Sequence, residues 1–377
     1  MTTKVVILKS RIAHQGGLEK HALRLANGFA KRKCKVIILS CGHEEFKGQP
    51  FHVINLCPYR KLNASRLRRY DALCNQWLQE HGANVVFGME RTQNQTHYRA
   101  GNGVHAQYLK QRRLSDSLLK RASFAINPLH RTILSLERSC FESPSLKKLF
   151  TNSYMVRQEI LNHYNTDPEK IETIHNGVEW REMQQDFDAW QDQRRTLLMQ
   201  WGLNKDKYQL LFIGQGFRRK GLQFLLQGMS ALNRQDIQLS VIGKDREAHK
   251  FQKMSQKLGL AQQVKFFGTR SDVHRFYQAA DALAIPSIYD PFANVTVEAQ
   301  AMGLFVISSK YNGGKEILNP KSGHVIENLD DADSVAESLK IAINHPKTAL
   351  SAASIRKNTQ HLDFSYQLDK VLTSTLN

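Results

Sequence analysis

The sequence lacks every cysteine arrangement that would staple a small fold or hold a metal ion. No two of its five cysteines have the C-x-x-C spacing, and no Cys/His group has the spacing of zinc ligands. An odd, scattered set is typical of buried thiols in a reducing compartment. These cysteines are Cys34, Cys41, Cys57, Cys74 and Cys140.

Long apolar runs are also missing. No stretch of about 18 apolar residues occurs, so we expect no transmembrane helix. The amino-terminal MTTKVVILKSRIAHQGG contains too short an apolar run for a signal peptide. With 377 residues the chain is long enough for two packed domains, and we expect it to be cytoplasmic.

Acidic residues are scarce relative to basic ones. There are 34 Asp and Glu against 53 Lys and Arg, a net charge of +19. Residues 1–180 carry 28 basic and 14 acidic side chains, whereas residues 181–377 carry 25 and 20. This uneven excess indicates a nucleic acid, an anionic membrane or an acidic substrate as partner. A basic but otherwise ordinary soluble surface is the alternative.

Short apolar runs alternate with amphipathic stretches along the whole chain, which is typical of βα units around a parallel sheet. The pattern predicts an α/β fold of two Rossmann-like domains that face each other across a cleft and bind ligands beyond the carboxyl ends of their strands. Strands are predicted at 5–8, 36–39, 84–89, 209–214, 238–243, 264–268, 282–287 and 304–309, and helices at 18–29, 66–78, 220–232, 247–260, 271–280 and 294–303.

A domain boundary is expected near residue 180, where an Asn-Gly turn leads into a Gln- and Asp-rich segment. The first domain then spans 1–180 and the second 181–362. The last residues, 363–377, predict a short amphipathic helix that is free to pack on either domain, including back on the first.

Two turns after predicted strands have the composition of anion sites. Gly16 and Gly17 precede the first helix, where backbone N–H groups can approach an anion, although on these residues alone a tight turn is the favoured explanation. Arg219 and Lys220 stand in GQGFRRKG, at the start of a helix. Two cations and a helix amino end can clamp a diphosphate, and a solvated basic turn is the alternative.

Two carboxylates follow in YDPFANVTVEAQAMG. Glu298 lies inside an apolar helical run, where an acid must be paired or functional. Asp290, in the preceding loop, is placed to face the same side. A pair of carboxylates beside a cationic clamp is suited to accept hydrogen bonds from the hydroxyls of a sugar nucleotide.

These residues carry a family resemblance over nearly the whole chain. The ordered segments TNSYMVRQEI, KIETIHNGV, LLFIGQGFRRKGL, VKFFGTRSDV and IYDPFANVTVEAQAMG resemble the retaining glycosyltransferases of family 4. That resemblance implies the GT-B fold, with an acceptor-side first half and a nucleotide-sugar-binding second half. The segment YRAGNGVHAQYL is most similar to the bacterial lipopolysaccharide core glucosyltransferase I group.

The resemblance also implies a role for each matching residue. The glycine pair faces the donor phosphates, Arg219 and Lys220 neutralise the diphosphate leaving group, Asp290 reads sugar hydroxyls and Glu298 reads the ribose. His105 lies near the reacting sugar, with Asn102 beside it on the acceptor side. Further donor contacts are implied for Thr269 and Arg270, at the uracil ring, and for the backbone amides of Phe292, Ala293, Asn294 and Val295.

The chain departs from the family pattern in places. Asp290 stands where the family usually has Glu, so its charge is one methylene further back. Where relatives have Gly-x-Pro-Val this chain has GLFV at 303–306. Relatives often carry Asp at the position of Asn102, and some lack a His at 105, so a structural turn is the alternative for that loop.

No D-x-D motif lies at a strand end, and the acidic cluster at 330–333 is better explained as a helix start. We therefore expect no metal cofactor: cationic side chains would stabilise the departing nucleotide. The expected function is retaining transfer of a hexose, with glucose as first candidate, from a UDP-sugar to a lipopolysaccharide core or related anionic glycolipid at the inner membrane.

Two alternatives stay open. One is a family 4 enzyme acting on another envelope polysaccharide or glycolipid, since the second-half motifs read only the donor. The other is a basic protein that holds nucleic acid or lipid. No RNA-binding aromatic pattern, zinc finger or helix-turn-helix signature supports nucleic acid as a partner.

Overall fold

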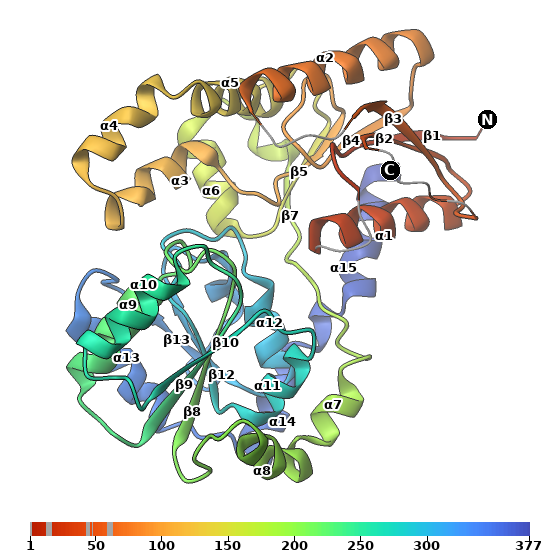
Figure 1. Cartoon of the computed structure of the whole chain (residues 1–377). Coiled ribbons are helices and arrows are strands. Elements are labelled where there is room, and N and C mark those ends of the chain that lie inside the picture. Colours follow the sequence, from red (N-terminus) through yellow and green to blue (C-terminus); the bar gives the residue numbers. More distant parts are fainter. Residues whose placement is uncertain (1, 13–16, 43–45, 47, 59–62) are drawn as a thin grey trace. The chain divides into compact units, whose positions relative to one another are not determined.

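The fold is described from a computed structural model, which covers residues 2–12, 17–42, 46, 48–58 and 63–377. The chain divides into two compact units (Figure 1). The first comprises Met1–His175 together with Gln367–Asn377, and the second comprises Asn176–Tyr366. The chain therefore passes from the first unit to the second between His175 and Asn176, close to residue 180, where the sequence predicts a domain boundary.

The first unit contains a seven-stranded parallel sheet in the order β3-β2-β1-β4-β5-β6-β7. Its strands are β1 (Lys4–Leu8), β2 (Lys35–Cys41), β3 (His52–Cys57), β4 (Val85–Gly88), β5 (His97–Arg99), β6 (Lys148–Thr151) and β7 (Ile171–Thr173). Its helices are α1 (Gly17–Lys31), α2 (Ala64–His81), α3 (His105–Gln111), α4 (Leu118–Ile126), α5 (Pro128–Phe141), α6 (Tyr154–His163) and most of α15 (Phe364–Leu376).

The alternation of side chains along β1 divides the core of this unit into two layers. Val5 and Ile7 pack in one hydrophobic cluster with residues of α1 and α15, while Val6 and Leu8 pack in another with residues of α2. Successive side chains of a strand point to opposite faces, so a strand covered on both sides reads as a continuous apolar run. This is why VVIL is fully buried.

The second unit contains a six-stranded parallel sheet in the order β10-β9-β8-β11-β12-β13. Its strands are β8 (Tyr208–Ile213), β9 (Ile237–Ile242), β10 (Val264–Gly268), β11 (Ala282–Ile285), β12 (Phe305–Ser309) and β13 (Gly323–Ile326). Its helices are α7 (Gln184–Asp188), α8 (Trp190–Gln200), α9 (Leu222–Leu232), α10 (Ala248–Lys257), α11 (Val273–Ala279), α12 (Asn294–Ala301), α13 (Ala332–Ile343) and α14 (Ala349–Asn358).

The predicted α/β fold with two Rossmann-like parallel-sheet domains is confirmed. In each sheet the strand order reverses at one point, between β1 and β4 in the first unit and between β8 and β11 in the second. Ligands of such sheets bind where the loops leave the carboxyl ends of these two strands. The loops that follow β8 and β11 are those that carry the predicted clamp and Asp290.

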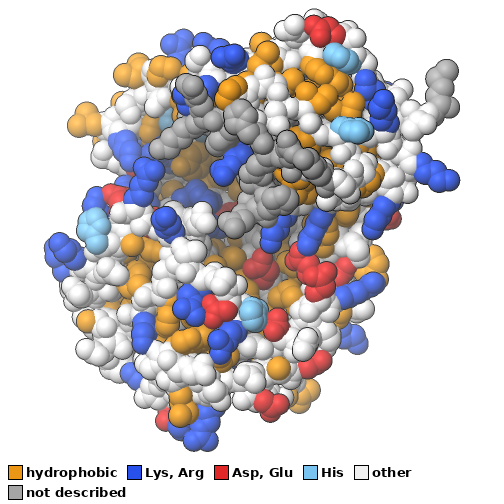
Figure 2. All heavy atoms as spheres, turned by 45° about the vertical axis from the view of Figure 1, so that its right-hand side comes forward, with side chains coloured by type: hydrophobic (Ala, Val, Ile, Leu, Met, Phe, Trp, Pro, Cys, Tyr) orange, Lys and Arg blue, Asp and Glu red, His pale blue; other side chains and the backbone are white. Residues whose placement is uncertain are grey.

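The acidic cluster at 330–333 begins a helix, as predicted. Asp331 is the N-cap of α13, and its side chain accepts the backbone N–H of Asp333 at 3.1 Å. None of the described helices combines the length and apolarity needed to cross a membrane. On the face drawn in Figure 2, Lys and Arg side chains are scattered over the surface among neutral residues.

The C-terminal helix α15 packs on the first unit, although residues 176–366 lie between them in the chain. Val371 and Leu372 belong to the hydrophobic cluster of α1 and β1. Leu372 lies so close to α1 that a Cβ at Gly28 would be 2.6 Å from its Cδ1. The helix and α1 are drawn next to each other in Figure 1.

Truncation of Leu372 tests this docking. The Leu372→Ala variant should lower the free energy of unfolding of the first unit by about 2–5 kcal/mol, because it leaves a cavity between α15 and α1. Urea unfolding followed by circular dichroism measures the change. Leu350→Ala is the matched control, since that leucine is 84% exposed. Equal stability of the two variants would show that α15 does not contribute to the core.

Candidate active site

The cationic loop after β8 is shaped by two glycines. Gly221 is the N-cap of α9 with a φ of 80°, and a Cβ there would lie 1.7 Å from the carbonyl oxygen of Pro286. A Cβ at Gly214 would lie 2.8 Å from Cγ of Lys220. A side chain at either position would collide with its neighbours. Glycine at both positions therefore allows the loop to pack against the loop after β11, with the stem of Lys220 next to Gly214.

Arg219 and Lys220 converge on one carboxylate oxygen in the loop after β11. Lys220 donates Nζ to Oδ2 of Asp290 at 2.5 Å, and Arg219 donates Nη1 to the same oxygen at 3.1 Å. Lys220 and Asp290 are 8% and 6% exposed. The backbone of Asp290 is also fixed, because its N–H donates to the carbonyl of Tyr311 and its carbonyl accepts from Gly313. The structure thus joins three predicted site residues in one ion cluster, in which Lys220 and Asp290 are buried.

The charges of this cluster depend on one another. Burial by itself would raise the pKa of Asp290, but Lys220 and Arg219 lower it below its ordinary value. Asp290 is therefore ionised at neutral pH, and the cations are held side by side. A ligand with two or more negative charges can bind the same cations, since part of the Arg219 side chain is exposed.

Glu298 lies on α12 and is held by a residue that the sequence analysis did not identify. Tyr277 of α11 donates its hydroxyl to Oε2 at 2.7 Å. The pKa of Glu298 is raised, mainly by burial and to a smaller extent by the charge of Glu179. The hydrogen bond from Tyr277 and the charge of Lys220 act in the opposite direction but do not cancel this shift. Both carboxylates of the predicted pair therefore experience the charge of Lys220.

The loop between Asp290 and α12 is organised by a buried asparagine. Oδ1 of Asn312 accepts the backbone N–H of Ala293 at 3.1 Å and of Gly314 at 3.0 Å. Its Nδ2 donates to Ser308 Oγ at 2.9 Å. Of the four predicted amides from Phe292 to Val295, that of Ala293 is thus already engaged within the protein.

The other predicted residues of this loop differ in their surroundings. Phe292 is buried in a cluster with Val297, whereas Asn294 is exposed and its Oδ1 accepts Nδ2 of Asn176 at 2.8 Å. Val295 is half-buried in the first turn of α12. The amino end of α12 is therefore fixed in place, with Asn294 at its surface.

Thr269 and Arg270 follow β10, at the edge of the sheet. Thr269 is exposed. Arg270 forms two hydrogen bonds of 2.8 Å with the carboxylate of Asp272 and lies over the ring of Phe276. The described contacts do not join these two residues to the Asp290 cluster, so their predicted role at a base ring remains a prediction.

The remaining predicted residues belong to the first unit. Gly16 lies outside the described residues, and Gly17 is the first residue of α1. Asn102 is exposed in a turn. His105 begins α3, and its Nε2 is 3.0 Å from Nδ1 of His130.

The ring of His105 is uncharged at neutral pH. Burial and, to a smaller extent, the charge of Arg91 lower its pKa to about 4, although Glu137 acts in the opposite direction. A neutral imidazole carries one N–H donor and one acceptor nitrogen. The hydrogen bond with His130 uses Nε2, so only Nδ1 of this ring is left for another partner.

Three residues that hold predicted site residues in place were not predicted from the sequence. They are Tyr277, Asn312 and Glu137. The only signal for Glu137 is an acid on the apolar side of RTILSLERSCF, where Leu136 and Cys140 are also buried. Tyr277 and Asn312 carry no such signal, because a buried tyrosine or asparagine is ordinary in a helix or a loop.

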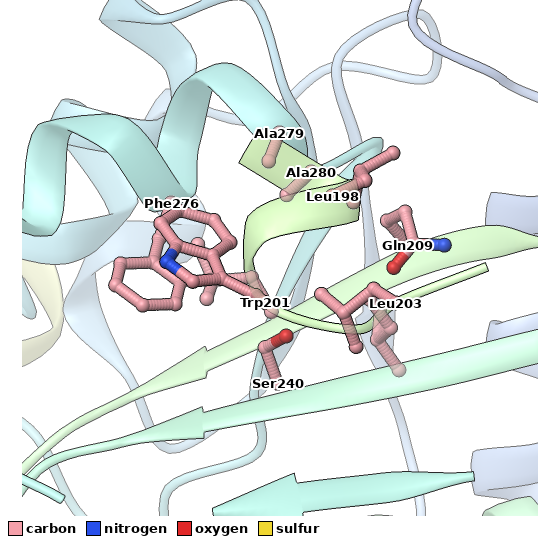
Figure 3. A pocket seen from close by; sticks show the side chains of 10 residues that line it. Leu198, Trp201, Leu203, Gln209, Ser240, Phe276, Ala279 and Ala280 are labelled. Atoms are coloured by element: carbon pink, nitrogen blue, oxygen red, sulfur yellow. The ribbon is translucent and has the colours of Figure 1, made fainter. Parts of the chain in front are cut away.

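A small pocket in the second unit is separate from these residues. Trp201 and Phe276 stack there with ring centroids 4.0 Å apart, and Leu198, Leu203 and Ala279 complete the apolar wall (Figure 3). None of the predicted site residues lines it. Its walls come from α8, α11 and the strands, so we interpret it as a packing gap behind the sheet.

Comparison with known proteins identifies similar chains for both halves. The family model described as "Glycosyltransferase Family 4" matches residues 15–180, and the model "Glycosyl transferases group 1" matches residues 193–361. The lipopolysaccharide glucosyltransferase WaaG of Escherichia coli is 25% identical over 350 residues, covering 92% of this chain and 90% of WaaG. The uncharacterized glycosyltransferase MJ1607 of Methanocaldococcus jannaschii is 24% identical, covering 85% and 83% of the two chains.

Solved structures show the same fold. The crystal structure of WaaG aligns with a TM-score of 0.78 at 24% identity, over 98% of this chain and 99% of that one. Anabaena Alr3699/HepE, solved with UDP and glucose, aligns with a TM-score of 0.69 at 16% identity over the whole of both chains.

Removal of the lysine tests the buried ion cluster. The Lys220→Met variant should lower the free energy of unfolding of the second unit by about 3–5 kcal/mol at neutral pH, because a buried carboxylate loses its nearest cation. The pKa of Asp290 lies below its unfolded value, so its contribution is present above that value and is lost as the pH falls. The deficit of the variant should therefore be complete at neutral pH and shrink as the pH falls below about 4. Urea titrations at both pH values measure it.

The control is Lys205→Met, which breaks an exposed pair with Asp206 and should change stability by less than about 0.5 kcal/mol. In the double variant Lys220→Met/Asp290→Asn the loss should be smaller than in Lys220→Met alone. A pH-independent deficit would contradict the assignment of the cluster as a charge pair.

Proposed function

The chain belongs to the family 4 glycosyltransferases of the GT-B fold, and on that premise we propose that it transfers a hexose from a UDP-sugar to a hydroxyl of a lipopolysaccharide core or a related cell-envelope glycolipid. Glucose is the first candidate sugar. The observation that carries the proposal is the Asp290–Lys220–Arg219 cluster at the strand reversal of the second sheet. The similarity to a lipopolysaccharide glucosyltransferase supports the acceptor.

The leaving group explains the two cations. Departure of UDP concentrates negative charge on the diphosphate, and fixed cations stabilise that charge without reorganisation. Lys220 and Arg219 are already oriented by Asp290, so the diphosphate would meet a preformed pair. We propose that these side chains take the place of a metal ion in this step.

The two carboxylates would accept hydrogen bonds from hydroxyl groups of the donor. Oδ2 of Asp290 holds the cations, so Oδ1 would accept from the sugar, and Glu298 would accept from the ribose. Retention of configuration is proposed from the family pattern, with the departing phosphate deprotonating the acceptor on the same face of the sugar. No separate protein base is then needed. His105, being neutral, would donate or accept a hydrogen bond near the reacting sugar.

Loss of Glu298 tests the donor site. The Glu298→Ala variant should reduce kcat/KM for UDP-sugar-dependent transfer at least about 100-fold, because the carboxylate that would accept a hydrogen bond from the ribose hydroxyls is removed. Transfer from UDP-glucose, UDP-galactose and UDP-N-acetylglucosamine onto truncated lipopolysaccharide cores provides the assay. Glu337→Ala, an exposed acid on α13, is the control and should retain full activity.

Two results would contradict these assignments. Transfer that survives Glu298→Ala would show that the donor site is elsewhere. Absence of UDP-sugar binding in calorimetry with the unmodified protein would oppose the whole proposal. A different polysaccharide acceptor with the same UDP-sugar would keep the donor site and change only the acceptor.

Helix α4 supports peripheral contact with the cytoplasmic face of an anionic membrane. It has no buried residue, and Leu118, Leu119 and Ile126 are 76%, 87% and 77% exposed. Lys120 and Arg121 lie on the same helix, which has no acidic residue. Exposed apolar side chains next to cations suit the interface of an anionic bilayer. We propose that the first unit docks there to reach its glycolipid acceptor.

Vesicle sedimentation tests this contact. The Leu118→Ser/Leu119→Ser variant should bind vesicles of phosphatidylglycerol and phosphatidylethanolamine at least about tenfold more weakly, since two apolar side chains no longer enter the interface. Leu350→Ser, at a leucine that is similarly exposed (84%) but lies on α14, should bind like the unmodified protein. Equal binding of all three proteins would exclude α4 as the contact.

A further inference from the structure

A buried carboxylate in the first unit gathers donors from three separate segments. Glu137 of α5 is 0% exposed. Its oxygens accept the backbone N–H of His105 at 2.9 and 2.8 Å, and Oε1 accepts that of Ala106 at 3.3 Å. Tyr164 donates its hydroxyl to Oε1 at 2.6 Å, and Arg91 donates Nε to Oε2 at 2.5 Å.

These bonds give α3 the cap that its own sequence does not provide. The N-cap of α3 is Val104, which makes no side-chain capping bond. The first N–H groups of a helix need an acceptor from outside the helix, and a negative charge is favoured there. Glu137 supplies both from a neighbouring helix, so the backbone position of His105 depends on it.

Arg91 extends the same arrangement to the other side of the turn. Its Nη2 donates to the carbonyl oxygen of Gly103 at 2.8 Å while its Nε binds Glu137. Burial by itself would lower the pKa of Arg91, and the Glu137 carboxylate raises it, so the guanidinium remains charged. One ion pair therefore holds the backbone at both Gly103 and His105.

The helix that carries Glu137 also contacts the ring of His105. His130 lies seven residues earlier on α5, which places it on the same face. Its Nδ1 is 3.0 Å from Nε2 of His105. Helix α5 thus contacts both the backbone and the imidazole of this residue.

We infer that Glu137 is a positioning residue, which fixes the turn carrying Asn102 and His105 by capping α3 and orienting Arg91. This inference rests on the proposed function, because the turn matters for catalysis only if His105 acts at the reacting sugar. A contribution to stability alone is the competing explanation. The two explanations differ in what they predict for kcat.

The variant Glu137→Gln separates them. It keeps the shape of the side chain but replaces one acceptor oxygen with a donor that faces other donors. We expect kcat for transfer to fall about 10- to 100-fold through misplacement of the turn. The KM for the UDP-sugar and the affinity for UDP should stay within about threefold, since Arg219, Lys220 and Glu298, the side chains proposed to hold the donor, lie in the other unit. Amide hydrogen exchange should accelerate at His105 and Ala106.

The matched control is Glu142→Gln, at the C-cap of the same helix. Glu142 accepts one backbone N–H, from Asn165, and has no described contact with the turn, so kcat should be unchanged. If Glu137→Gln does not fold, Tyr164→Phe replaces it. That variant removes one donor and should lower kcat less than Glu137→Gln but more than the control.

The outcomes are distinct. Unchanged kcat in a folded Glu137 or Tyr164 variant would overturn the inference, and so would a parallel loss of kcat and UDP affinity. If the unmodified protein transfers no sugar, the proposed function fails by itself. Hydrogen exchange at His105 and Ala106 then still decides whether Glu137 holds the turn.

Discussion

The second unit is organised around one buried carboxylate that holds two cations. A charge removed from water must be paired, and Asp290 meets that requirement through Lys220 and Arg219. Because the partners lie in the loops after β8 and β11, their attraction fixes the relative position of these two loops. The close packing of Gly221 on Pro286 and the hydrogen bonds of Asn312 depend on that position.

The first unit contains an equivalent connection. Lys9, directly after β1, donates Nζ to Glu90, two residues after the end of β4, at 2.5 Å. In both sheets a cation after one central strand thus meets an acid after the strand across the point of reversal. In the second unit the backbone also connects the two loops, because the N–H of Ile288 donates to the carbonyl oxygen of Arg219 at 2.9 Å. The ion pairs add side-chain connections at the points where the loops leave the sheets.

Those site residues that stand out within a short segment could be predicted from their residue types and their place in the chain. Arg219, Lys220 and Asp290 follow apolar runs that end a strand, and Glu298 interrupts an apolar helix, so their chemistry was visible without coordinates. Tyr277 and Asn312 were not visible, since nothing distinguishes them until β12 and α11 are placed beside α12. The predicted strands did not include β3, β5, β6, β7 and β13. Strands β5 and β7 have three residues each, too few to show an alternating pattern.

The sequence by itself determined part of the succession of strands and helices, the two-domain α/β class and the family, since these depend on local periodicity and on ordered motifs. Only the tertiary structure decided which strands are neighbours, that α15 returns to α1, that one oxygen of Asp290 serves two cations, and that Glu137 caps α3. Each of these contacts joins residues far apart in the chain. Their energies come from burial and from charge pairing in the folded interior, which no short window of sequence records.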